Sequence, residues 1–182
     1  MKVIALVSGG KDSILCAQEC IARGHEVICF ANLKPPLPTT TTATPANDGN
    51  NNTDQELDSF CFQTVGHQAV RAMSQCAGIP LRTRCIEVGQ SLVQSLEYAT
   101  QHKNDEVEQM YELIREIKEE FPEANAVCSG AILSDYQRLR VENVCSRLGL
   151  SSLAFLWQKS YSDVLGKIVD QGVDARLVKT AT

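Results

Sequence analysis

Two short stretches of this sequence carry residues that could bind an anion, and each follows an apolar run. The first, residues 8–13 (SGGKDS), comes directly after the apolar run 2–7. Two adjacent glycines let backbone N–H groups approach a phosphate closely, and a helix starting at the loop adds partial positive charge. Lys11 supplies a full charge, and Ser8 and Ser13 supply hydroxyl donors. The loop is predicted to hold phosphate, although it lacks the Gly-x4-Gly-Lys-Ser/Thr spacing of the Walker loop.

Asp12 is the unusual member of this loop, because a carboxylate repels phosphate unless a cation lies between them. We expect Asp12 either to cap the N-terminus of the following helix or to face Mg²⁺. The plainer alternative for the whole loop is a tight strand-to-helix turn with Asp12 as the cap.

The second stretch, residues 129–142 (SGAILSDYQRLRVE), is predicted to open a helix capped by Ser134 or Asp135. Arg138 then lies in the first turns, where its planar guanidinium could bind a carboxylate or a phosphate bidentately. The alternative is a surface ion pair, because Arg138 and Glu142 are four residues apart on a helix.

The elements that must position these stretches alternate along the chain. Hydrophobic periodicity predicts strands at 2–7, 26–31, 81–86, 124–128, 150–156 and 173–178, and helices at 12–23, 60–77, 105–120, 134–148 and 161–170, the last capped by Ser160. The segment 91–101 fits neither pattern. This alternation predicts an α/β fold with a parallel sheet and helices on both faces. Both stretches then lie at carboxyl ends of strands, where such sheets bind ligands.

Composition narrows the class of protein. The 182 residues, 43% of them apolar, fit one domain, 1–182, with a polar Thr/Asn-rich tract at 35–58 that is predicted to be a disordered insertion. A net charge of −5 argues against general nucleic-acid binding and gives no reason to expect direct DNA binding. No apolar run of membrane-spanning length and no secretory signal are present, so we expect a cytoplasmic protein that binds no membrane.

Eight cysteines occur, and none forms a Cys-x-x-Cys pair. In a chain without a secretory signal we expect reduced thiols. Cys16 and Cys20 lie one helical turn apart, which could indicate a metal pair, but buried apolar thiols are the favoured interpretation.

Residues 8–13 resemble the signature loop of the PP-loop, or N-type, ATP pyrophosphatases. The resemblance implies a Rossmann-like HUP-type fold, with ATP and Mg²⁺ as cofactors and the adenine near residues 31–33. It implies cofactor binding by Ser8, Gly9, Gly10, Lys11, Asp12, Ser13, Asn32, Ser129 and Gly130, with Asp12 on the metal.

Four further motifs resemble the diphthine–ammonia ligase branch of that superfamily: QTVGH at 63–67, the acidic stretch 105–112, GAILSDYQRLRVE at 130–142 and the LGL…LW pattern at 148–157. The resemblance implies ATP-dependent amidation, by ammonium, of the diphthine residue on translation elongation factor 2, yielding AMP and pyrophosphate. Lys11, Asp12 and Arg138 would be catalytic. The substrate side would comprise His67, Tyr136, Gln137, Arg138, Arg140, Glu142 and Trp157.

Alternatives stay open for several of these residues. His67 could only satisfy a core hydrogen bond, and Trp157 could only pack. The acidic helix at 105–120 is either a solvated face or a docking surface for a basic protein substrate.

Two other functions also stay open. One is a PP-loop enzyme that adenylates tRNA, which the acidic composition disfavours. The other is an ATP-binding module without turnover, because the Gly/Glu-rich C-terminal segment usual in the resembled family is not found in this sequence.

Overall fold

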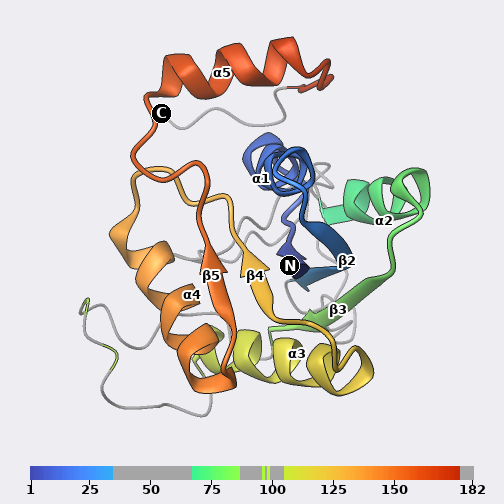
Figure 1. Ribbon diagram of the computed structural model, residues 1–182, viewed down its shortest axis with the longest axis vertical. Coiled ribbons are helices and arrows are strands. Elements are labelled where there is room, and N and C mark those ends of the chain that lie inside the picture. Colours follow the sequence, from blue (N-terminus) through green and yellow to red (C-terminus); the bar gives the residue numbers. More distant parts are fainter. Residues whose placement is uncertain (35–66, 87–95, 97, 99–104, 177–182) are drawn as a thin grey trace, which may run out of the picture.

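The computed structural model describes residues 1–34, 67–86, 96, 98 and 105–176, and these form one five-stranded sheet flanked by helices (Figure 1). The predicted insertion at 35–58 lies outside the described residues. In this described part of the chain, no helix has both the length and the apolar character needed to cross a membrane.

All strand pairs in the sheet are parallel, and the strand order is β3-β2-β1-β4-β5. The strands are β1 (Lys2–Leu6), β2 (Glu26–Lys34), β3 (Leu81–Cys85), β4 (Ala126–Cys128) and β5 (Ser151–Leu153). The helices are α1 (Lys11–Ala22), α2 (His67–Ala77), α3 (Glu106–Glu120), α4 (Asp135–Leu148) and α5 (Tyr161–Asp170). The predicted Rossmann-like α/β fold is therefore confirmed.

The helices form a layer on each face of the sheet, as predicted. Helices α1, α2 and α5 cover one face, and α3 and α4 cover the other (Figure 1). The central strand β1 is buried on both sides, with Val3 and Ala5 packed toward α1 and Ile4 toward α3. This explains why residues 2–7 read as a continuous apolar run.

The strand order reverses between β1 and β4. The chain runs outward from β1 through β2 to β3, and then crosses the sheet to place β4 against the other side of β1. At such a switch point the loops after the two neighbouring strands diverge and leave a crevice. The two stretches identified in the sequence, 8–13 and 129–142, follow β1 and β4 respectively.

The predicted strand at 173–178 is wrong over residues 173–176, which form no strand, while 177–178 lie outside the described residues. Gly172 adopts a left-handed conformation, and the Val173 N–H donates to the Ile168 carbonyl at 3.0 Å. The backbone here therefore closes the end of α5 instead of joining the sheet. Strand β5 is also shorter than predicted, because a turn in which the Trp157 N–H donates to the Ala154 carbonyl follows it.

Glycine is required at position 130, where β4 ends against the start of α1. A Cβ built on Gly130 would lie 2.9 Å from the Asp12 carbonyl carbon, 2.9 Å from the Ser13 nitrogen and 3.0 Å from the Asp12 oxygen. These are backbone atoms, which cannot rotate away as a side chain could. Any side chain at position 130 would therefore push the loop after β1 away from β4.

Helix α5 is joined to α1 by a buried carboxylate. Glu19 accepts hydrogen bonds from Lys167 Nζ at 2.6 Å and Gln171 Nε2 at 3.3 Å, and it also pairs with Arg23. The bond from Lys167 lowers the pKa of Glu19, although burial acts in the opposite direction and Arg23 assists the lowering. The carboxylate thus stays ionised in the folded protein.

Replacing Gly130 by alanine is expected to lower the free energy of unfolding by roughly 1–3 kcal/mol, because the new methyl group overlaps the Asp12–Ser13 backbone. Gly166→Ala is the matched control. Gly166 is a helical residue with no atom near its would-be Cβ, so this variant should gain up to about 1 kcal/mol. Urea unfolding of both variants measures the contrast, and equal effects would contradict the close approach.

Replacing Glu19 by glutamine is expected to cost roughly 1–3 kcal/mol, because Lys167 and Arg23 lose their charged acceptor. A lowered folded-state pKa means that the stabilisation is present above the ordinary glutamate value of about 4.3 and is lost as the pH falls through the folded pKa. The variant should therefore lose less stability than the wild type on acidification.

Urea unfolding at several pH values measures the stability of the variant and of the wild type. Hydrogen exchange of the α5 amides shows whether α5 is the part that loosens. The exposed Glu26, paired with Lys2, gives the control Glu26→Gln, for which we expect less than about 1 kcal/mol. An equal loss in both variants would show that the Glu19 contacts do not hold α5.

Candidate functional site

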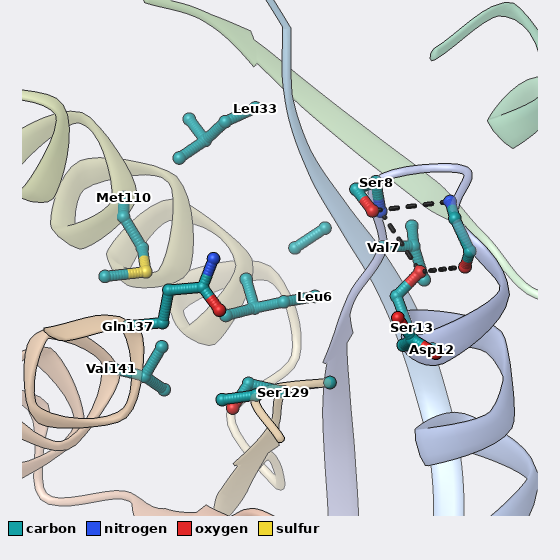
Figure 2. A pocket seen from close by; sticks show the side chains of 14 residues that line it. Leu6, Val7, Ser8, Asp12, Ser13, Leu33, Met110, Ser129, Gln137 and Val141 are labelled. Carbon is teal, nitrogen blue, oxygen red and sulfur yellow. Dashed lines mark hydrogen bonds between the residues drawn. The ribbon is translucent and has the colours of Figure 1, made fainter. Parts of the chain in front are cut away.

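A cavity of about 170 Å³ opens at the switch point between β1 and β4. Its walls come from the loop after β1, the end of β2, the loop after β4, and the facing sides of α3 and α4 (Figure 2). The lining residues are Leu6, Val7, Ser8, Gly10, Asp12, Ser13, Ala31, Leu33, Met110, Ser129, Gly130, Ala131, Gln137 and Val141.

The cavity has a polar end and an apolar end. Ser8 and Ser13 lie together in the loop after β1, whereas Leu33, Met110 and Val141 lie on the opposite side (Figure 2). Such a division suits a ligand with an anionic part and a flat apolar part.

The loop after β1 is held by hydrogen bonds between its own residues. The Ser8 N–H donates to Ser13 Oγ at 3.3 Å, and the Gly10 N–H donates to Ser8 Oγ at 3.3 Å. The Ser13 hydroxyl in turn donates to the Gly10 carbonyl at 2.8 Å. Gly9 has a φ of 86°, in the left-handed region that favours glycine. Ser8, Gly10 and Ser13, which were predicted to bind the cofactor, are thus hydrogen-bonded to one another within the loop.

Helix α1 begins at this loop without a capping side chain. Its N-cap is Gly10, which has no side-chain oxygen, whereas α3, α4 and α5 are capped by Asp105, Ser134 and Ser160. The caps predicted at Ser134 and Ser160 are confirmed. Because the first turn of α1 has no side-chain acceptor, its N–H groups are available to an anion.

Asp12 is the second residue of α1, so the capping role considered for it is wrong. Its Oδ2 lies 3.0 Å from Lys11 Nζ, while Oδ1 is buried and has no hydrogen-bond partner among the described residues. Ser129 Oγ, on the other wall of the cavity, is also buried without a described partner. A buried carboxylate oxygen without a donor fits a site for a divalent cation.

Asn32 lies at the end of β2 but does not line the cavity. Its Nδ2 donates to the Val7 carbonyl at 2.7 Å, and its side chain is buried. This bond joins the carboxyl ends of β1 and β2, which shapes the loop that follows. Gly9 and Lys11 also lie outside the lining set, whereas the other predicted cofactor residues belong to it.

Helix α4 points its predicted functional side chains in different directions. Gln137 and Val141, four residues apart, line the cavity (Figure 2). Arg140 is buried between the rings of Tyr98 at 4.6 Å and Tyr136 at 4.4 Å. Arg140 is therefore buried and Tyr136 is half-buried, and both lie outside the cavity lining.

Arg138 contacts two carboxylates and the Trp157 ring. Its guanidinium pairs with Glu142 at 2.6 Å and Asp135 at 3.2 Å, and its Cζ lies 4.7 Å from the centre of the Trp157 ring. These carboxylates, Glu142 before Asp135, raise the pKa of Arg138 further. The ion pair with Glu142 weighed in the sequence is thus present. His67 begins α2, and its side chain lies outside the described part.

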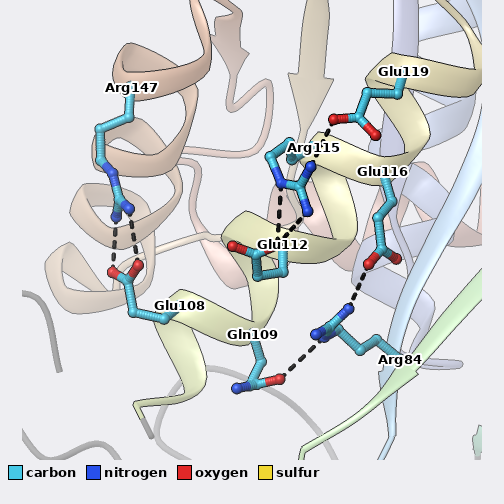
Figure 3. A network of polar contacts seen from close by, with 8 residues as sticks. All are labelled: Arg84, Glu108, Gln109, Glu112, Arg115, Glu116, Glu119 and Arg147. Atoms are coloured by element: carbon cyan, nitrogen blue, oxygen red, sulfur yellow. Dashed lines mark hydrogen bonds and ion pairs between the residues drawn. The ribbon is translucent and has the colours of Figure 1, made fainter. Parts of the chain in front are cut away.

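The acidic helix is largely neutralised by arginines. Arg147 pairs with Glu108 through two bonds of 2.8 Å, and Arg84 reaches Gln109 and Glu116 (Figure 3). Farther along α3, Glu112 and Glu119 pair with Arg115, and Glu120 pairs with Arg82. The helix therefore presents paired carboxylates instead of free negative charge, which favours the solvated-face interpretation.

The sequence did not single out the apolar end of the cavity. Leu6, Met110 and Val141 read as core residues, because an apolar side chain at strand or helix spacing predicts burial in either case. Only the expectation that the adenine lies near residues 31–33 pointed to this end, which Ala31 and Leu33 line.

Curated relatives resemble the whole of this chain. Proteins named diphthine–ammonia ligase are 45% identical in Schizosaccharomyces pombe, 44% in Rattus norvegicus and 42% in Homo sapiens, each over 181 residues and 100% of this chain. The chain spans 62% of the rat and human proteins and 27% of the yeast protein.

A solved structure described as a predicted subunit of tRNA methyltransferase from Methanocaldococcus jannaschii aligns with 91% of this chain and 72% of its own. Its TM-score is 0.42 and its identity 14%, a likeness too weak to bear on function.

The model of one family matches residues 51–152, which is more than half of the chain and contains α2, β3, α3, β4 and α4. That family is described as the diphthamide synthase N-terminal domain. Together with relatives 41–45% identical across the full chain, this match establishes that the chain belongs to the diphthamide synthase N-terminal domain family.

Proposed function

We propose that residues 1–182 form an ATP-binding domain that activates the diphthine carboxylate of translation elongation factor 2 for amidation by ammonia. The observation that carries the proposal is the divided cavity, in which an uncapped helix and the unpaired Asp12 Oδ1 lie at the polar end. The family membership supplies the reaction, because the full-chain relatives are named diphthine–ammonia ligase.

The cavity gives the nucleotide an orientation. The phosphates would bind the Ser8–Ser13 loop and the first turn of α1, where N–H groups and the Lys11 ammonium offset their charge. The adenine would lie against Leu33, Met110 and Val141, away from the serines (Figure 2). Ser129 and Gln137 line the cavity, and the sugar and the α-phosphate would lie against them.

Asp12 would hold Mg²⁺ together with phosphate oxygens. Its unpaired, buried Oδ1 fits this role, because Mg²⁺ is bound by one or two carboxylates plus substrate phosphates. When bound, the ion supplies charge stabilisation to the phosphates. Asp12 itself is held by its place in α1 and by Lys11 at 3.0 Å.

The proposed reaction balances in two steps. A diphthine carboxylate oxygen forms a bond to the α-phosphorus of ATP, and the bond to pyrophosphate breaks. Ammonia then forms a bond to the activated carbonyl carbon, AMP leaves with the former carboxylate oxygen, and a proton is released. Neither step needs a covalent nucleophile from the protein, so Lys11 and the loop N–H groups act by stabilising charge on the phosphates.

The acceptor would approach along α4. Arg138, held by Glu142 and placed over Trp157, is the charged group nearest in sequence to the cavity residue Gln137. It could bind the diphthine carboxylate or the α-phosphate bidentately. Buried Arg140, packed against the half-buried Tyr136 ring, would support α4.

Lys11→Ala is expected to lower AMP formation by at least about a hundredfold, because the variant lacks the ammonium group that would stabilise negative charge on the phosphates. The assay measures AMP and pyrophosphate from Mg-ATP and ammonium with elongation factor 2 carrying diphthine. Lys2→Ala, at the opposite end of β1, is the matched control and should be unaffected. If ATP binds but no AMP forms, the chain is an ATP-binding module without turnover and the proposal is wrong. If AMP forms only when tRNA is added, the substrate is tRNA and not elongation factor 2.

Asp12→Asn is expected to raise the Mg²⁺ concentration needed for ATP binding by roughly tenfold or more, because a neutral amide replaces the carboxylate ligand. Calorimetric titration with ATP at graded Mg²⁺ concentrations measures the shift. Asp163→Asn, in the first turn of α5, should leave it unchanged. An identical Mg²⁺ dependence in the Asp12 variant would exclude Asp12 as the metal ligand.

A further inference from the structure

Three cysteines meet in the core between β4 and α1. The sulfur atoms of Cys16, Cys20 and Cys128 all lie within 4.8 Å of one another, and all three side chains are buried. Cys16 and Cys20 are one turn apart on α1, and Cys128 is the last residue of β4. The sequence indicated only the pair on the helix; the third thiol comes from the strand that faces it.

The convergence follows from the fold. Strand β4 alternates its side chains, so Cys128 faces α1 while Val127 faces the opposite layer. Pairing of β4 with β1 sets the height of Cys128 beside the helix that follows β1. The three donors are thus brought together by a strand and the helix that packs against it, as part of the fold itself.

The other described cysteines do not cluster in this way. Cys29 and Cys145 are buried on the opposite face, Cys76 is exposed and Cys85 is half-buried. Within the described residues, the only group of three or more potential metal ligands is this set of thiols. A single buried cysteine such as Cys29 is explained by cysteine acting as a small apolar residue. That explanation does not account for three sulfur atoms within 4.8 Å of one another.

The spacing suits a metal ion. Zinc–thiolate bonds of about 2.3 Å place sulfur atoms about 4 Å apart around one ion, so the observed limit of 4.8 Å needs only a small contraction. Soft sulfur donors select thiophilic ions such as Zn²⁺ and Cu⁺ over Mg²⁺, so the ion proposed at Asp12 would not compete here.

We propose that Cys16, Cys20 and Cys128 form a binding site for a thiophilic metal ion, coordinated by three thiolate sulfurs. Three metal–sulfur bonds form, three S–H bonds break, and the protons pass to solvent; no sulfur changes its oxidation state. One of the protons lost is the one that Cys16 Sγ donates to the Ser129 carbonyl at 3.0 Å. The site therefore lies directly behind the wall of the nucleotide cavity, yet it does not depend on nucleotide binding.

The test uses the full chain, reduced and stripped of metal by a chelator, titrated with Cd²⁺. We expect one tightly bound equivalent with thiolate-to-cadmium absorption in the ultraviolet, and a rise in melting temperature, because the ion binds the folded state. Cys128→Ala should weaken Cd²⁺ binding by at least about a hundredfold. The matched control Cys145→Ala, also buried but on the opposite face, should bind as the wild type does.

X-ray absorption of the cadmium-loaded wild type gives a second measurement that needs no variant, and three sulfur neighbours are expected. The proposal is overturned if no tight equivalent binds, if fewer than three sulfurs surround the ion, or if Cys128→Ala, folded by circular dichroism, keeps wild-type affinity.

Discussion

The backbone contact between Gly130 and the first turn of α1 is the constraint on which the site depends. It holds the loop after β4 against the loop after β1 at a distance that admits no side chain. Because the two loops touch there, the buried oxygens Asp12 Oδ1 and Ser129 Oγ face one cavity from its two walls. The parallel sheet supplies the switch point; this contact determines how wide the crevice is at its polar end.

The start of α1 differs from the starts of α3, α4 and α5, each of which has a capping side chain. Asp105, Ser134 and Ser160 each satisfy an N–H of their helix, whereas Gly10 leaves α1 without such a bond. A glycine at the N-cap costs only about a few tenths of a kcal/mol relative to a capping serine or aspartate, whereas an unpaired buried carboxylate oxygen costs roughly 1–3 kcal/mol or more. Both departures lie in the same loop, and a bound phosphate with its cation would relieve both. Local instability concentrated at one place is what a functional site predicts.

The sequence was sufficient for the fold and for the polar end of the site, and less so for the rest. Apolar periodicity predicted β1, β2 and the five helices, because burial on one or both faces leaves a direct pattern. It gave no means of sorting the candidates on α4. There, residues close in sequence line the cavity (Gln137), form a half-buried ion pair (Arg138) and lie in the interior (Arg140). The predicted strand at 173–178 is wrong over 173–176, because the Val173 N–H donates to the Ile168 carbonyl at the end of α5 and is not free to pair with a strand. Strand propensity alone does not reveal such a competing bond.

Helix α1 connects the features described above. Its first turn lines the cavity, its middle carries Cys16 and Cys20, and its last turn carries Glu19, which holds α5 through Lys167. The hydrogen bond from Cys16 to the Ser129 carbonyl links the thiol cluster to the cavity wall at 3.0 Å. A helix fixed at three places along its length cannot shift at one without straining the others, because a packed core deforms little. The position of the loop after β1 is therefore set by the whole of α1, including its contacts with β4 and α5.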